Sequence, residues 1–247
     1  MILLIGQSNM DGRNDISDLP GELREINRKV RIQYNDYTWR QMRAGNSGFA
    51  HQNGTIFFGP ELSFGAEITA AFPEASTILL LKSSRGGTSM THWNPPDGLQ
   101  YKLLLKRINK FFTDCAKLNP EIVGAVWMQG ESDSLESGMA ERYAENLTAF
   151  IAELRRQTGN PSLPFVIGQV YAGDHPGQGS AVRNPEKMQI VHDAQQQVAD
   201  QDDFVALVVT DDLTLRDPYH YDAASTVELG KRFAQALAEL VKKNAKQ

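Results

Sequence analysis

Five short apolar runs, separated by longer helical stretches, constrain the fold of this chain more than any other feature of its sequence. Almost every residue in each run is apolar, which is typical of parallel strands that are buried on both faces. Between the runs, apolar residues recur at helical spacing. The strand-like runs cover residues 2–5, 76–82, 122–128, 164–170 and 204–210, and the helical stretches cover 61–72, about 104–115, 139–157, 185–199 and 229–240.

Strands and helices that alternate in this way predict an α/β protein with helices on both faces of one sheet. Right-handed crossovers between parallel strands favour a doubly wound arrangement. We therefore predict a three-layer α/β/α sandwich around a flavodoxin-like, five-stranded parallel sheet. The length of 247 residues matches one such domain, spanning residues 1–247.

The composition excludes several classes of partner and site. A net charge of −5 without a basic block excludes nucleic acid and anionic membranes as expected partners, and no apolar run is long enough to span a bilayer. Cys115 is the only cysteine, so neither an internal disulfide nor a thiolate metal cluster can form, and we place Cys115 in the core.

The start of the chain bears on its location in the cell. Met1 directly precedes the first predicted strand, so no signal peptide is visible. We therefore expect a cytoplasmic protein, or a secreted or periplasmic one whose export segment has been removed. The sequence does not indicate an oligomeric state.

Two segments lack a regular pattern. Residues from about 11 to 59 are polar and rich in Gly, Asn and Arg, and residues 173–184 include four Gly or Pro residues. Long connections without clear structure are often functional. We expect both segments to border a cleft.

Polar or glycine-rich segments follow four of the five predicted strands. Ser8 follows the first strand, residues 85–89 follow the second, 129–133 the third and 217–220 the fifth. In open α/β sheets, ligands bind beyond the carboxyl ends of the strands. The fold would therefore bring these four segments to one rim of the sheet, where we expect the functional site.

The residue types at this rim fit nucleophilic catalysis. A serine hydroxyl is a weak nucleophile until a base takes its proton, and the imidazole of His220 titrates near neutral pH. Asp217 can hold the other imidazole nitrogen, because a turn-like backbone brings residues at this spacing to one side. Each residue also has a local structural interpretation, with Ser8 as a helix cap and Asp217 as a turn residue. Asp222 is better placed as the N-cap of the last helix.

An acyl-transfer site also needs hydrogen-bond donors for the oxyanion of the tetrahedral intermediate. The candidate donors are the amide of Ser8, an amide of Gly86 or Gly87, and the side-chain amide of Gln129. The glycine pair could equally form a tight turn, and Gln129 could simply end a strand. Their occurrence together at one rim favours the oxyanion site.

Five short blocks, in order along nearly the whole chain, match the motifs of one known family. Gln-Gly-Glu and Asp-x-x-His are unspecific alone, but together with Gly-Gln-Ser-Asn-Met they are specific. The blocks are Gly-Gln-Ser-Asn-Met at 6–10, Gly-Pro-Glu at 59–61, Gly-Gly-Thr-Ser at 86–89 with Trp93 shortly after, Trp-Met-Gln-Gly-Glu-Ser-Asp at 127–133 and Asp-Pro-Tyr-His at 217–220. They resemble the SGNH (GDSL-type) hydrolases, in the carbohydrate esterase and sialate O-acetylesterase branch that is similar to acetylxylan esterases.

The resemblance implies a serine esterase that removes O-acetyl groups from carbohydrates and uses neither a cofactor nor a metal. It implies that Ser8 is the nucleophile, His220 the base and Asp217 the partner of that base. The expected partner is an acetylated sugar or polysaccharide. Acetylated xylan and O-acetylated sialic acid are not distinguished, because the polar insert at 11–59 aligns with no substrate class.

The resemblance also suggests roles for residues around the triad. Gln129 stands in the block where broader SGNH enzymes carry an oxyanion-binding Asn. Glu131 and Asn9 would support this site, Glu131 by orienting Gln129 or the nucleophile loop.

Aromatic and cationic residues near the rim are candidate substrate contacts. The rings of Trp93 and Tyr219 could stack on sugar faces, although a tryptophan is as commonly packed inside a protein. Arg85, with Arg13 and Arg43, could bind an acidic sugar, although most arginines are simply solvated.

Several other functions fit parts of the sequence. A non-catalytic carbohydrate-binding domain on the same fold would not need Asp217 and His220. A general short-chain carboxylesterase would accept longer acyl groups. A nucleotide-binding domain would need a glycine-rich phosphate loop, which is missing after the first strand. A metal hydrolase could draw on Glu131, Asp133 and the Asp217–His220 pair, but no paired-histidine spacing occurs.

Overall fold

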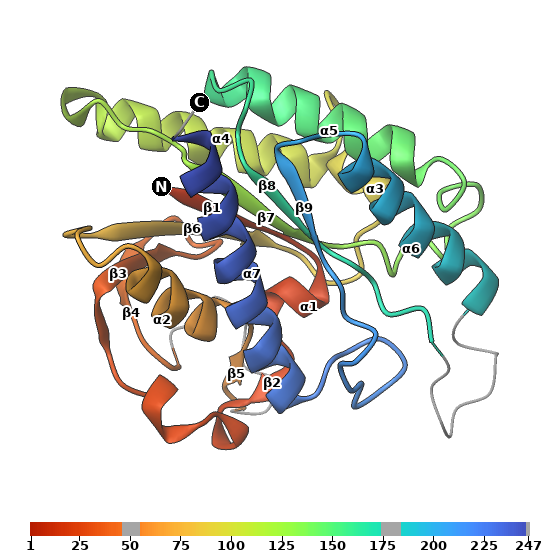
Figure 1. Cartoon of the computed structure of the whole chain (residues 1–247), viewed down its shortest axis with the longest axis horizontal. Helices are drawn as coiled ribbons and strands as arrows, with labels where there is room; N and C mark the ends of the chain where they lie inside the picture. The colour runs from red at the N-terminus through yellow and green to blue at the C-terminus, as the bar shows by residue number, and fades with distance from the viewer. Residues whose placement is uncertain (46–54, 174–183, 246–247) are drawn as a thin grey trace.

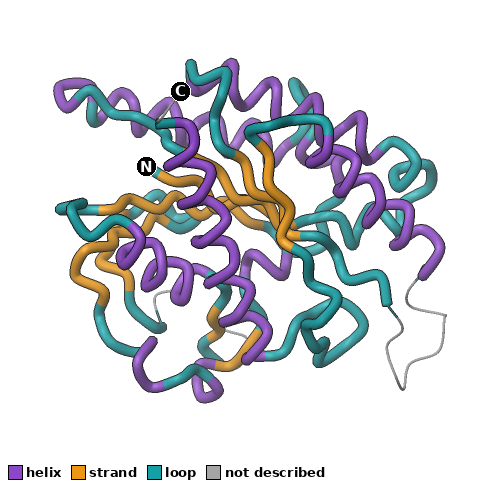
Figure 2. Tube along the Cα trace, in the orientation of Figure 1, coloured by secondary structure: helices purple, strands orange, loops and turns teal. Residues whose placement is uncertain are grey.

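The computed structural model of the chain describes residues 1–45, 55–173 and 184–245. It confirms the predicted α/β architecture, with a central and mostly parallel sheet flanked by helices (Figures 1 and 2). All five predicted parallel strands are present. They are β1 (Ile2–Gly6), β6 (Ile78–Ser84), β7 (Gly124–Met128), β8 (Phe165–Gly168) and β9 (Val205–Val208).

The prediction of a five-stranded sheet was incomplete, because the described sheet has seven strands in the order β4-β3-β6-β1-β7-β8-β9. The extra strands β3 (Asn27–Gln33) and β4 (Trp39–Met42) come from the segment predicted to be irregular. Strand β3 pairs parallel with β6, and β4 pairs antiparallel with β3 at the edge. Arg28, Lys29 and Arg31 are interspersed with buried Val30 and Ile32, so this strand lacks the continuous apolar run of a central strand.

Residues of β1 alternate between two cores, one on each face of the sheet. Leu3 and Ile5 pack into the cluster covered by α4, α5 and α6, whereas Ile2 and Leu4 pack into the cluster covered by α2 and α7. Figure 1 shows α7 crossing in front of the strands beside α2. Cys115 is half-buried against the first cluster. The helices are α2 (Glu61–Ala71), α3 (Met90–Trp93), α4 (Leu99–Asp114), α5 (Tyr143–Thr158), α6 (Pro185–Asp200) and α7 (Ala223–Asn244).

The last helix begins where the sequence predicted a cap. The Asp222 side chain accepts a hydrogen bond of 2.8 Å from the Ser225 amide, which satisfies one of the free donors at the start of α7. This cap anchors the chain immediately after His220. Among the helices in the described ranges, none combines the length and the apolar character needed to cross a membrane.

Strand β1 lies between β6 and β7, where the chain changes its winding direction across the sheet. At such a point the connections on either side run apart and leave a crevice beyond the carboxyl ends of the strands. The start of the polar insert borders this crevice through Arg13. A short ribbon, β2 (Asn14–Asp15) with β5 (Phe57–Phe58), closes the described part of that insert. Of the second irregular segment, residues 174–183 lie outside the described residues.

Candidate active site

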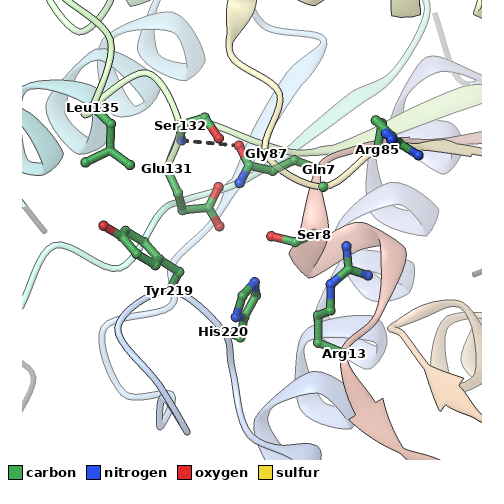
Figure 3. A pocket seen from close by; sticks show the side chains of 11 residues that line it. Gln7, Ser8, Arg13, Arg85, Gly87, Glu131, Ser132, Leu135, Tyr219 and His220 are labelled. Carbon is green, nitrogen blue, oxygen red and sulfur yellow. Dashed lines mark hydrogen bonds between the residues drawn. The ribbon is translucent and has the colours of Figure 1, made fainter. Parts of the chain in front are cut away.

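A pocket of about 430 Å³ opens at this crevice (Figure 3). All four segments that the sequence predicted to converge contribute to its walls. The lining residues are Gln7, Ser8 and Arg13 after β1, Arg85, Gly86 and Gly87 after β6, Glu131, Ser132 and Leu135 after β7, and Tyr219 and His220 after β9.

Ser8 is the first residue of α1 (Ser8–Asp11), a single turn that follows β1 directly. Its side chain is buried except toward the pocket, where Figure 3 shows the hydroxyl. Within the described residues, no hydrogen bond holds this hydroxyl. The amide of Ser8 heads the turn, where helical amides have no intrahelical partner.

Asp217 and His220 form a close pair on the opposite wall. The Nδ1 atom of His220 lies 2.8 Å from both Asp217 Oδ1 and Oδ2. The Oδ1 atom also accepts hydrogen bonds of 3.0 Å from the amides of Tyr219 and His220. This fixes the imidazole so that Nε2, its other nitrogen, is the one available to the pocket.

The surroundings of this pair shift both of its pKa values downward. Partial burial favours the neutral Asp217 carboxyl, but the hydrogen bonds from the Tyr219 amide and from His220 outweigh it and lower the pKa of Asp217. Burial lowers the pKa of His220, and the nearby charges of Arg13 and Arg216 add to this effect against the opposing charge of Asp217. Neutral His220 therefore remains available to accept a proton down to a lower pH than an ordinary histidine.

Ser8 and His220 face each other across the pocket in Figure 3. No hydrogen bond joins their side chains among the residues that the structure describes. Hydrogen bonds between catalytic groups are often long without a bound substrate and tighten when one is present. The structure therefore places Ser8 and His220 in one pocket, with Asp217 beside His220.

Asn9 ties the nucleophile turn to the loop that carries His220. Its Nδ2 donates to Glu131 Oε1 and, at 2.8 Å, to the carbonyl of Tyr219. Its Oδ1 accepts from the Tyr221 amide at 3.3 Å. Asn14, which the sequence interpretation did not single out, adds a hydrogen bond of 3.1 Å to the Tyr221 carbonyl. The bonds to Tyr219 and Tyr221 connect positions 207 to 212 residues apart, and the bond to Glu131 spans 122 residues, so no local sequence signal indicates them.

Comparisons with known proteins show the family of the chain. The family model described as "Carbohydrate esterase, sialic acid-specific acetylesterase" matches residues 1–239. The chain belongs to this family. The esterase is 26% identical to a probable carbohydrate esterase of Arabidopsis thaliana over 186 residues, which are 70% of this chain and 69% of that protein.

Solved structures show the same fold. An X-ray structure of an Arabidopsis thaliana protein matches with a TM-score of 0.78 and 25% identity, over 96% of this chain and 97% of that chain. A carbohydrate acetylesterase from Xanthomonas citri has a TM-score of 0.72 at 17% identity, over 98% of this chain and 56% of that one. NanS has a TM-score of 0.71 at 14% identity, over 98% and 97%. The family establishes a carboxylic ester hydrolase, in a family of carbohydrate acetylesterases, and the solved structures show that its fold is that of other carbohydrate acetylesterases.

The structure of the esterase does not support Gln129 as an oxyanion donor, which corrects the sequence prediction. Gln129 is fully buried and does not line the pocket. Its Nε2 donates to the Thr88 carbonyl at 2.8 Å and to Asp133 Oδ2. Burial raises the pKa of Asp133 to about 7, against the lowering effect of hydrogen bonds from the Met90 amide and Gln129. Gln129 therefore serves an internal network beneath the site.

Gln7, unlike Gln129, lines the pocket. Its Oε1 accepts hydrogen bonds from the Ser132 amide at 3.3 Å and from Gln129 Nε2 at 3.4 Å. The amide group is thereby oriented with Nε2 toward the pocket, as Figure 3 shows. Within the described residues, no hydrogen bond occupies this Nε2. The residue stood in the quoted Gly-Gln-Ser-Asn-Met block, and its position next to Ser8 was the available signal.

Gly86 is the residue of the glycine pair that lies against the nucleophile. A Cβ on Gly86 would stand 3.5 Å from Ser8 Cβ and 2.3 Å from Arg13 Nη2, whereas one on Gly87 would meet nothing within 4 Å. The Arg85 amide donates to the Gly6 carbonyl at 3.0 Å and holds this loop beside the end of β1. A side chain at position 86 would therefore collide with Arg13, which packs with the nucleophile turn directly against this glycine.

The predicted substrate contacts divide into two groups. Trp93 is fully buried in the core and donates from Nε1 to Thr88 Oγ1 at 3.0 Å, so the prediction that it stacks on a sugar was wrong. Arg85 and Tyr219 line the pocket, whereas Arg43 does not. The sequence alone does not distinguish a tryptophan that packs in the core from one that stacks on a sugar.

Proposed function

We propose that the protein is a serine O-acetylesterase of carbohydrates with Ser8 as nucleophile, His220 as general base and Asp217 as the residue that orients it. The observation that carries the proposal is the pair of 2.8 Å contacts from Asp217 to Nδ1 of His220, whose ring lines the same pocket as Ser8. This arrangement leaves His220 Nε2 to take the serine proton.

The reaction proceeds in two matched halves. His220 removes the proton of Ser8 as Oγ attacks the acetyl carbonyl, and the tetrahedral intermediate then expels the sugar oxygen, which takes this proton from His220 and leaves as a hydroxyl. His220 then deprotonates a water molecule that attacks the acetyl-serine. Collapse of the second intermediate releases acetate and returns the proton to Ser8.

Three donors support the oxyanion in this proposal: the amides of Ser8 and Gly86 and the side-chain Nε2 of Gln7. The Ser8 amide heads a helical turn, Gly86 packs beside the Ser8 side chain, and Gln7 presents an unoccupied N–H group to the pocket. Gln7 thereby takes the part in which SGNH enzymes use an asparagine.

Replacing Gln7 by leucine should lower kcat for acetate release by roughly 10²–10³-fold, because one donor to the oxyanion is lost. The Michaelis constant should change far less, since the donor acts mainly on the transition state. Steady-state kinetics on an aryl acetate and an acetylated sugar would measure both constants. The same substitution at exposed Gln235 on α7 is the control. A Gln7→Leu enzyme with nearly native kcat would exclude Gln7 from the oxyanion site.

One side of the pocket is positively charged and the other is apolar, which suggests how a substrate is oriented. Arg13 and Arg85 provide positive charge near Ser8, while Leu135, which is 57% exposed, and Tyr219 provide an apolar wall. We place an acidic substituent of the sugar on the arginine side and a sugar face against Tyr219.

Acetate release and active-site labelling together test the function. The native protein should release acetate from O-acetylated sialic acid with a lower Michaelis constant than from acetylated xylo-oligosaccharides, and a fluorophosphonate should label Ser8. Binding of sugars without acetate release or labelling would instead indicate a carbohydrate-binding protein. Equal hydrolysis of acetyl and longer acyl esters of one alcohol would indicate a general carboxylesterase.

A further inference from the structure

An ion pair lies in the interior beside the nucleophile turn. The Nζ atom of Lys82 is 2.7 Å from Glu61 Oε2, and the two side chains are only 2% and 1% exposed. The same ammonium donates a hydrogen bond of 2.8 Å to the carbonyl of Asp11 and lies 5.6 Å from the ring centroid of Tyr34. The reaction steps proposed above use neither of these charges.

The carbonyl of Asp11 is the far end of the turn that begins with Ser8. This turn has four residues, and its closing hydrogen bonds run from the Asp11 amide to Gln7 O and from the Gly12 amide to Ser8 O. A helix of this length is not stable by itself. The direction of the Ser8 side chain therefore depends on what holds the turn from outside. Lys82 connects the end of the turn to β6.

The Gly-Pro-Glu block at 59–61 completes this connection. Glu61 Oε1 accepts a hydrogen bond of 3.4 Å from the Gly59 amide, while Oε2 holds Lys82. A Cβ on Gly59 would stand 2.9 Å from the Met10 carbonyl and 2.7 Å from Glu61 Oε2, so the chain here packs directly against the nucleophile turn. The block otherwise has no part in the reaction.

Stability alone does not account for a buried ion pair at this place. Removing two charges from water is costly, and an apolar pair of similar volume is often as stable or more so. An apolar pair cannot, however, donate a charge-assisted hydrogen bond to the Asp11 carbonyl. We propose that Lys82, held by Glu61, is a positioning residue that sets the orientation of Ser8 for attack. This inference rests on the proposed role of Ser8 as nucleophile.

The test compares two variants. The double variant combines Lys82→Met and Glu61→Gln, and the single variant carries Glu61→Gln alone. The double variant leaves no uncompensated buried charge, so it should fold and should be at least as stable as the single variant. The single variant keeps the ammonium on the Asp11 carbonyl. We expect kcat to fall by about 10-fold to 100-fold in the double variant, with a Michaelis constant within about threefold of native. The single variant should retain more activity than the double one.

A remote ion pair supplies the control. Arg155 and Asp202 form a bidentate pair at the opposite end of the sheet, next to the starts of β8 and β9. The variant Arg155→Met with Asp202→Asn should lose thermal stability but keep native kcat below its melting temperature. If the activities of all variants simply follow their stabilities, Lys82 and Glu61 have only a structural role and the inference is wrong.

The rate at which a fluorophosphonate labels Ser8 separates this inference from the proposed function. A native protein that is not labelled at Ser8 contradicts the proposed function itself. If the native protein is labelled and the double variant is labelled at the same rate, only the positioning role of Lys82 is wrong. We expect the labelling rate of the double variant to fall in parallel with its kcat.

Discussion

Replacing Ser8 by alanine is expected to lower kcat/KM for acetate release by at least about 10⁴-fold, because the proposed acetyl-serine intermediate at position 8 can no longer form. A small residual rate above that of water is expected, since the oxyanion donors and the sugar contacts remain. Acetate release measured over long incubations, with the fluorophosphonate as a titrant of active native enzyme, would quantify both rates.

The fold of the Ser8→Ala enzyme should be unaffected. Within the described residues the Ser8 hydroxyl makes no hydrogen bond, so its removal leaves no buried polar partner unsatisfied. A melting temperature within about 2 °C of native would correspond to a small change in unfolding free energy. If the folded variant keeps more than about a tenth of native activity, Ser8 is not the nucleophile.

The sheet and the place of the site were predictable because they follow from patterns that burial imposes. Buried parallel strands must be apolar along their whole length, so β1 and its four parallel companions stand out. The carboxyl ends of such strands meet at one edge, so Ser8, Gly86 and His220 could be placed together before their positions were known. Asp222 could be recognised as a cap from its local sequence.

The remaining features depend on packing that the sequence does not encode locally. Strand β3 was missed because charged residues occupy its exposed face near the sheet edge. Gln7 and Gln129 are the same residue type at two strand ends, and only the three-dimensional structure shows that one reaches the pocket and the other Asp133. Burial of Trp93 was equally invisible, because its neighbours in the core come from distant segments.

Replacing Asp217 by asparagine should lower kcat/KM by roughly 10³–10⁴-fold, because the asparagine favours the tautomer of His220 that cannot act as a base. The Oδ1 atom of Asp217 already accepts the amides of Tyr219 and His220, so the oxygen of an asparagine would take this place. Its NH₂ group would then face Nδ1, which must become a hydrogen-bond acceptor. The ring proton would move to Nε2, and Nε2 could no longer accept the proton of Ser8.

The pH dependence of the Asp217→Asn enzyme gives an independent readout. Because burial lowers the pKa of His220, the acidic limb of the native kcat/KM profile should lie below about pH 6.5, the ordinary histidine value. The Asp217 charge opposes that lowering, so its removal should shift the limb to still lower pH while the plateau falls. The variant Asp222→Asn, which exchanges one good helix cap for another, should leave both limb and plateau near native. A limb that moves to higher pH in Asp217→Asn would show that Asp217 does not act on His220 as its charged partner.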